Sequence, residues 1–109
     1  MDLAVRRVER QDGVGVAVAG EVDAYTAPTM LTKLLAAVEQ DPRLTVDLAA
    51  VTFMDSQGLA VLLRVRQEVE RRGGELRLAQ VSPRVLRLLQ LTRMDTVFAL
   101  PPTPDSTHA

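Results

Sequence analysis

Cysteine is absent from this 109-residue sequence and histidine occurs once, and both scarcities exclude kinds of chemistry. Without a thiol the chain forms neither a disulfide nor a thiolate centre. The one histidine, His108, is the penultimate residue and follows a proline-rich stretch, so no element is expected to hold it rigidly for catalysis or metal binding. We therefore expect no catalytic residue, no metal and no cofactor.

Aromatic residues and charge of one sign are also scarce. Aromatics make up 3% of the residues and the formal net charge is −1, with basic and acidic residues interleaved. Single strands need stacking platforms and duplexes need a basic face, so nucleic acid is not an expected partner. No apolar run approaches the roughly 18 residues of a membrane helix, and no signal-type apolar segment follows the N-terminus. The sequence predicts a cytoplasmic protein that does not engage a membrane.

Glycine-rich phosphate loops are missing as well. Neither the G-x-G-x-x-G pattern nor the P-loop pattern G-x-x-x-x-G-K-[ST] occurs, so no nucleotide site is predicted. The glycine pair Gly13 and Gly15 is ascribed to a turn and a strand. A small nucleotide-binding or hydrolytic enzyme is therefore the least favoured function.

The apolar residues that are present follow strand and helix periods in turn. Strands are expected at 3–8, 14–18, 44–54 and 76–78, with 97–100 as a candidate last strand. The turn-forming Gln11-Asp12-Gly13 makes the first two strands an antiparallel hairpin. Helices are expected to begin with Thr26 as N-cap, near Ser56, and at Ser82 followed by Pro83. The core stripe of the first helix is expected to be Leu31, Leu34, Leu35 and Val38.

Strands separated by helices and joined by short connections are typical of β-α-β units with right-handed crossovers. The predicted fold class is therefore α/β, with a mixed, mainly parallel sheet of about four to five strands, an N-terminal antiparallel hairpin and about three to four packed helices. One domain is expected over residues 1–100. A disordered C-terminal tail is expected over 101–109, where proline is frequent and apolar residues are few.

Function in an open α/β sheet gathers at the carboxyl ends of the strands, which here lead into the loops 21–26 and 54–58. The second loop places an acid and a hydroxyl, Asp55 and Ser56, at a helix start. Met54 occupies the first glycine position of a G-x-S-x-G elbow and no base is at hand, so Ser56 is not expected to be a nucleophile. Serine is also a preferred N-cap, which leaves helix capping and a functional role as two interpretations of Ser56.

Three segments, taken in order, resemble one bacterial family. They are Gly20-Glu21-Val22-Asp23 through Pro28, Val46 through Asp55-Ser56-Gln57-Gly58-Leu59, and Val81-Ser82-Pro83 through Asp95. The resemblance covers about residues 3–100 and is to the STAS-domain anti-sigma factor antagonists. Gln57 stands where that family more often has Ser, Ala or Thr. Arg93 replaces a usual glycine, which predicts a differently built turn after the last helix.

The resemblance implies a partner switch that binds and does not catalyse. In its unphosphorylated state such a protein binds an anti-sigma factor kinase of the GHKL ATPase type and thereby releases a sigma factor. Phosphorylation of the serine, here Ser56, switches binding off, and a PP2C-type phosphatase resets the cycle. Carried over by position, the partner-binding residues are Glu21, Asp23, Thr26, Asp55, Ser56, Gln57, Gly58 and Leu59.

Phosphorylation at a helix start fits a switch that leaves the fold intact. Free N–H groups and the helix dipole tolerate a phosphate there, so the added charge is expected to oppose docking without unfolding the domain. The alternative is a STAS module that is never phosphorylated and serves as an adaptor subunit of a transporter or a stress-signalling complex. The sequence leaves these two functions, and the oligomeric state, open.

Overall fold

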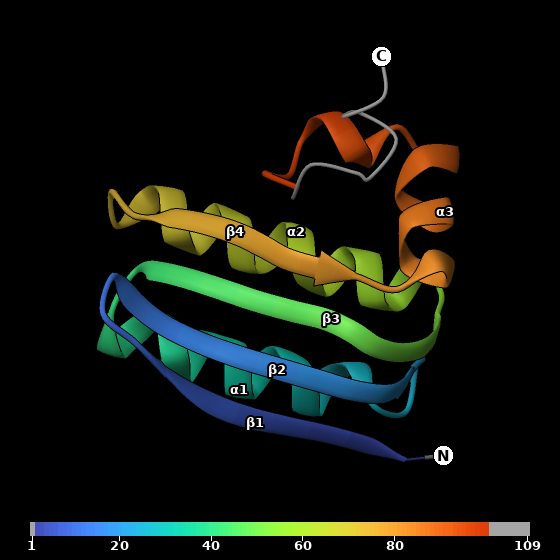
Figure 1. The fold of residues 1–109 in the computed structure, drawn as a ribbon, viewed down its shortest axis with the longest axis horizontal. Coiled ribbons are helices and arrows are strands. Elements are labelled where there is room, and N and C mark those ends of the chain that lie inside the picture. The colour runs from blue at the N-terminus through green and yellow to red at the C-terminus, as the bar shows by residue number, and fades with distance from the viewer. Residues whose placement is uncertain (1, 101–109) are drawn as a thin grey trace.

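Four strands form one mixed sheet, and two long helices lie against the same face of it (Figure 1). This computed structural model describes residues 2–100, so the predicted tail over 101–109 lies outside the described residues. The elements in chain order are β1 (Leu3–Arg10), β2 (Gly13–Val22), α1 (Ala27–Gln40), β3 (Arg43–Met54), α2 (Ser56–Arg71), β4 (Glu75–Val81), α3 (Pro83–Leu91) and the 3₁₀ turn η1 (Met94–Thr96).

The sheet has the order β1-β2-β3-β4. β1 pairs with β2 in antiparallel fashion, and β2, β3 and β4 are parallel to one another. Parallel neighbours need a crossover, and α1 and α2 supply the two that join β2 to β3 and β3 to β4. The predicted α/β class, the mainly parallel sheet and the N-terminal hairpin are confirmed, with four strands and three α-helices among the described residues.

Alternate residues of the central strands form the core between sheet and helices. Val14, Val16 and Val18 of β2, Leu44, Val46 and Leu48 of β3, and Leu76 and Leu78 of β4 are buried, together with Leu62, Val65 and Val69 of α2. The predicted stripe on α1 is partly wrong. Met30, Leu34, Ala37 and Val38 are fully buried, while Leu31 and Leu35 are half-buried. Ala37 also belongs to the apolar stripe, although its side chain is small. The row of side chains that faces the sheet is therefore the one next to the row that the leucines alone suggest.

The candidate last strand at 97–100 does not form. Met94–Thr96 is a 3₁₀ turn, and the residues after it make a single parallel bridge between Ala99 and Arg77 of β4. Phe98 is nevertheless buried, so this segment adds to the core without extending the sheet. Arg93 adopts the left-handed conformation, with φ 61° and ψ 22°, that glycine accepts most readily. The turn after α3 therefore keeps a glycine-like backbone despite the arginine.

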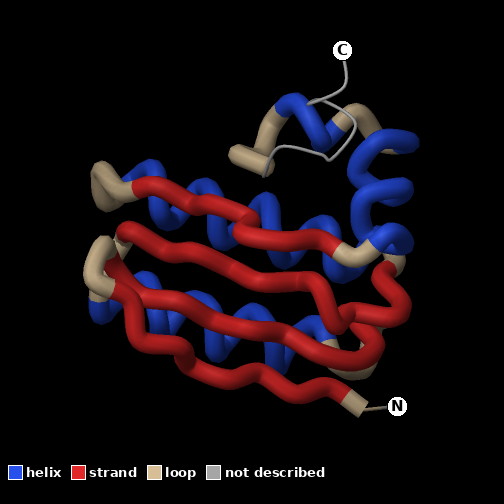
Figure 2. Tube along the Cα trace, viewed as in Figure 1, coloured by secondary structure: helices blue, strands red, loops and turns tan. Residues whose placement is uncertain are grey.

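The two ends of the sheet are built from different connections (Figure 2). At one end lie the β1–β2 turn and the first residues of β3 and β4. At the other end β2 and β3 finish, and their loops lead into α1 and α2. The second end holds every residue that the sequence singles out for function.

Candidate functional site

The loops that follow β2 and β3 lie side by side. Val22, the last residue of β2, pairs with Met54, the last residue of β3. The backbone N–H of Asp55 then donates to the carbonyl oxygen of Val22 at 3.2 Å. We call residues 21–26 and 55–59 together the candidate site.

Asp23 and Thr26 hold the first loop in shape. A carboxylate oxygen of Asp23 accepts from the backbone N–H groups of Tyr25 at 2.9 Å and Thr26 at 3.1 Å. The Thr26 hydroxyl lies 2.8 Å from the carbonyl oxygen of Glu21, to which it donates, and accepts from the Asp23 N–H at 3.0 Å. The prediction that Thr26 caps α1 is therefore wrong for its side chain. Thr26 has helical backbone angles, φ −97° and ψ −21°, and its hydroxyl points back into the loop.

Asp55, not Ser56, caps α2. Asp55 has an extended backbone, with φ −109° and ψ −168°, and its carboxylate oxygen accepts from the Gln57 N–H at 2.8 Å. Ser56 is the first residue of the helix itself, a position whose side chain does not reach the orphan N–H groups. The interpretation of Ser56 as a cap is therefore wrong. Among residues 2–100 the structure shows no hydrogen bond that the Ser56 side chain makes.

Gly58 lets the start of α2 approach both strand ends. A Cβ atom at this position would lie 2.5 Å from Cγ of Met54 and 2.8 Å from Cγ1 of Val22. Such contacts are too short for any side chain, so a residue other than glycine would push the helix start outward. Gly58 therefore fixes where Asp55 and Ser56 stand relative to the first loop.

Exposure divides the predicted partner-binding residues into three groups. Ser56 and Gln57 are exposed, and Glu21, Asp23 and Asp55 are half-buried. Thr26, Gly58 and Leu59 are buried, so these three shape the site from beneath. The sequence reasoning missed Tyr25, whose side chain is 88% exposed within the same loop. Its signal was available, because it is the only tyrosine in a chain with 3% aromatics.

A shallow groove runs between α1 and α2 beside these residues. Its lining is made of small and aliphatic side chains with two polar ones, and comprises Ala24, Ala27, Pro28, Leu31, Gln57, Ala60, Val61 and Arg64. Gln57 therefore belongs both to the helix start and to the groove wall. The exposed serine and an apolar depression are neighbours, which suits the docking of another macromolecule better than the enclosure of a small substrate.

The N–H groups at the start of α2 are already engaged. Asp55 accepts from Gln57 through its side chain and from Gly58 at 3.1 Å and Leu59 at 3.2 Å through its carbonyl oxygen. The expectation that free N–H groups would receive a phosphate is therefore wrong for these three. A phosphate on Ser56 would remain at the surface, beside the acidic cap Asp55.

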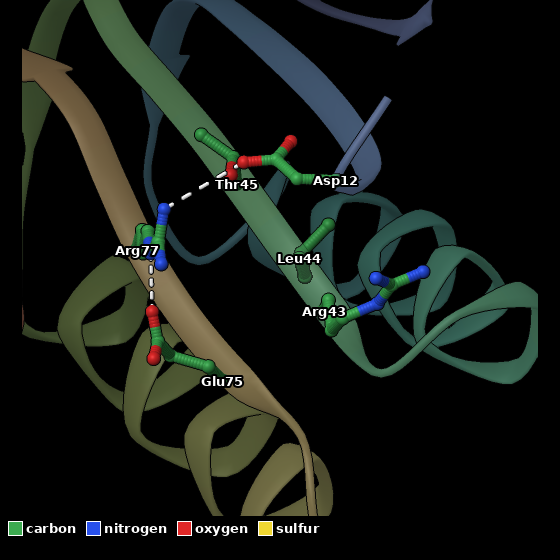
Figure 3. Close-up of a pocket in the computed structure, with 6 residues that line it drawn as sticks. All are labelled: Asp12, Arg43, Leu44, Thr45, Glu75 and Arg77. Carbon is green, nitrogen blue, oxygen red and sulfur yellow. Dashed lines mark hydrogen bonds and ion pairs between the residues drawn. The ribbon is translucent and has the colours of Figure 1, made fainter. Parts of the chain in front are cut away.

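The opposite end of the sheet also holds charged residues, and six of them form ion pairs with one another. Arg77 of β4 lies between Glu75 and Asp12, with 3.7 Å separating Arg77 from Asp12, while Arg43 extends away from them (Figure 3). Arg43 pairs with Asp41 at 2.7 Å, and Arg10 pairs with Asp12 at 3.1 Å. We call these six residues the ion-pair end. Their charges cancel, so we assign them a structural role and not a ligand site.

Residues 2–100 also bear on two other functions, metal binding and membrane spanning. No group of His, Cys, Asp and Glu residues in this range is arranged to hold a metal ion. None of the helices in the same range combines the length and apolar character needed to cross a membrane.

The strand order, the antiparallel first strand and the D-S-x-G start of α2 define a class of protein, the single-domain α/β modules of STAS type. The chain belongs to the STAS domain family, whose sequence model matches residues 5–108. It is 34% identical over 98 residues to the anti-sigma-B factor antagonist of Bacillus subtilis (strain 168), covering 90% of each chain.

Solved structures agree with this assignment. An anti-sigma factor antagonist from Mycobacterium paratuberculosis superposes with a TM-score of 0.83 at 30% identity, over 96% of this chain and 90% of that one. The anti-sigma factor antagonist SpoIIAA in its unphosphorylated form matches with a TM-score of 0.75 at 20% identity, over 95% of this chain and 93% of that one. The second similarity shows the shared fold alone.

Proposed function

We propose that this protein is an anti-sigma factor antagonist that works as a phosphorylation-controlled switch in the bacterial cytoplasm. In the unphosphorylated state it binds an anti-sigma factor of the GHKL ATPase type, and a sigma factor is released. The anti-sigma factor then phosphorylates Ser56 and binding ends. A PP2C-type phosphatase returns the protein to its binding state, and the protein itself catalyses no reaction.

One observation carries this proposal, namely the exposed Ser56 side chain beside a helix cap that does not use it. A structural serine is expected to bond to nearby backbone, as Ser82 does when it accepts from the Val85 N–H at the start of α3. Ser56 has the same sequence context of a helix start but leaves capping to Asp55. Its oxygen is accessible to a kinase, which would transfer the γ-phosphoryl group of ATP to it and release ADP and a proton.

Charge explains how the switch would turn binding off. A phosphoserine adds about 1.5 to 2 negative charges at neutral pH. Asp55 directly precedes Ser56, and Asp23 is in the adjoining loop, so the new charge joins two carboxylates. A partner that docks here must desolvate all three charges, which opposes binding without disturbing the core.

The surface around Ser56 supplies the binding energy in this proposal. Tyr25 is the exposed aromatic of the site, and tyrosine is enriched among residues that dominate interface energetics. The groove between α1 and α2 offers an apolar depression beside it for a side chain of the partner. Loss of Tyr25 or of the groove would weaken binding in the unphosphorylated state. The switch therefore needs this surface for binding and Ser56 for its control.

The experiment is a titration of the cognate anti-sigma factor against the wild-type protein, Ser56→Ala and Ser56→Asp. Wild type and Ser56→Ala should bind with equal affinity, while Ser56→Asp should bind at least roughly tenfold more weakly, since one interfacial charge is worth about 1.4 kcal/mol or more. Incubation with the anti-sigma factor and ATP should add one phosphate to the wild type and none to Ser56→Ala, as read by intact-mass spectrometry.

Ser82→Ala is the matched control, because it removes a serine at another helix start. It should still accept phosphate at Ser56 and lose it on dephosphorylation. Equal affinity of Ser56→Ala and Ser56→Asp, with no phosphate on the wild type, would contradict the switch and favour the unphosphorylated adaptor.

A further inference from the structure

We propose a second docking surface, the groove between the free edge of β3 and the first turns of α3, and we infer that it takes an extended acidic segment of a partner protein. The groove is lined by Ala49, Ala50, Val51, Thr52, Ser82, Pro83, Arg84 and Arg87. None of these residues belongs to the candidate site. The inference does not rest on phosphorylation of Ser56.

Along this groove, in the described residues, no strand pairs with β3 on the side that faces away from β2. β4 pairs with β3 from Arg43 to Leu48, and the last contact is the Ser82 N–H donating to the Leu48 carbonyl at 3.2 Å. β3 then continues to Met54 with only β2 beside it, as far as the described residues show. The chain turns instead into α3, whose Val85 and Leu89 are buried against the core. An edge of this kind is open to an added extended segment.

The rim of the groove is basic. Arg84 and Arg87 are exposed, and within residues 2–100 neither makes an ion pair. Six other arginines of the same range do have carboxylate partners, among them Arg43 and Arg77. The positive charge beside the β3 edge is thus left without an internal counterpart. Complementary charge on a partner means aspartate and glutamate.

The floor of the groove favours a polypeptide over a nucleic acid. Its exposed β3 residues are Ala49, Ala50 and Thr52, whose small side chains suit the close contacts of an extended peptide. Phe53, which follows the groove residue Thr52 in β3, is 36% exposed, but the Arg84 guanidinium lies 6.0 Å from its ring centroid. This cation–π contact occupies the face on which a base would stack and holds Arg84 at the rim.

The test uses a capped six-residue peptide of alternating glutamate and valine, titrated into the full chain labelled with ¹⁵N. A peptide of alternating lysine and valine is the charge control. The acidic peptide should shift the amide resonances of residues 49–52 and 84–87, and the basic peptide should not. The double variant Arg84→Glu/Arg87→Glu should bind the acidic peptide at least roughly tenfold more weakly, since two exposed charge pairs change from attraction to repulsion.

The double variant should fold, because glutamate is a good helix former and favours the first turn of α3. Its matched control is Arg6→Glu/Lys33→Glu, which changes net charge equally at exposed positions on β1 and α1 and should bind as the wild type does. Shifts elsewhere, equal binding of both peptides, or equal loss in the control variant would overturn the proposal. Tighter binding of a single-stranded oligonucleotide to the same residues would also overturn it. The same holds if the peptide binds only after residues 101–109 have been removed.

Discussion

At the ion-pair end Asp12, Asp41 and Glu75 each lie beside an arginine, whereas at the candidate site Asp23 and Asp55 lie beside backbone N–H groups. In both places the acidic side chains are satisfied within the chain. The difference is in what remains. The arginine pairs cancel charge and tie turns to strands, while Asp23 and Asp55 fix two loops and leave a neighbouring serine without a bond. Because Asp55 caps α2 in place of Ser56, the serine side chain is left exposed at the helix start.

The candidate site keeps its geometry only if the start of α2 cannot shift without cost. Replacing Gly58 by leucine should destabilise the domain by about 3 kcal/mol, because the side chain would overlap Met54 and Val22 at the strand ends. Urea unfolding measures this change. Ala60→Leu in the same helix is the control, since Ala60 is exposed and should tolerate the larger side chain. A loss of less than about 1 kcal/mol for Gly58→Leu would mean that the helix start is not held where the structure has it.

The capping role of Asp55 gives the next largest effect. Asp55→Ala should cost about 1 kcal/mol, within the usual range of about 0.5 to 2, because the Gln57 N–H loses its acceptor. Asp55→Asn keeps a capping oxygen and should recover most of that loss. If alanine and asparagine proved equally stable, the carboxylate would not be acting as a cap.

Ion pairs like those of the ion-pair end also occur on α2, where Arg71 and Arg72 pair with Glu68. Together these pairs predict that stability falls in acid. Hydrogen bonds from Arg71 and Arg72 lower the pKa of Glu68 to about 2, and Arg43 lowers the pKa of Asp41 to about 2. A carboxylate whose pKa is lower in the folded state stabilises the fold fully above its unfolded-state pKa. This contribution is lost as the pH falls toward its folded-state pKa. Thermal stability should therefore decline between about pH 5 and pH 2. Glu68→Gln should show a shallower decline, and an unchanged slope would contradict the pairing.

Much of the fold follows from the sequence because it rests on periodicity and on strong local signals. The boundaries near Gln40, Gly73 and Pro83 coincide with breaker residues, and Ser82 caps α3 as its position before Pro83 predicts. The predicted strand at 97–100 is wrong because this segment makes only one bridge, to Arg77. Whether such a segment pairs along its length depends on tertiary contacts, which the local sequence pattern does not show.

The candidate site was only partly predictable for a related reason. Asp55 and Ser56 are both good capping residues, and their order in the sequence does not say which one has the extended backbone that a cap requires. The contact between Asp55 and Val22 decides it, because that bond joins residues far apart in the chain. The burial of Leu59 likewise depends on packing, so a residue inside a motif proved to lie beneath the surface.

The smallest expected effect is the most direct test, since the Ser56 side chain has no structural bond to lose. The free energy of unfolding of Ser56→Ala, measured in urea beside wild type and Asp55→Ala, should differ from wild type by less than about 0.5 kcal/mol. Asp55→Ala should be clearly less stable in the same series. A loss of about 1 kcal/mol or more for Ser56→Ala would show that the hydroxyl holds the helix start, and would contradict the claim that it is left available for a kinase.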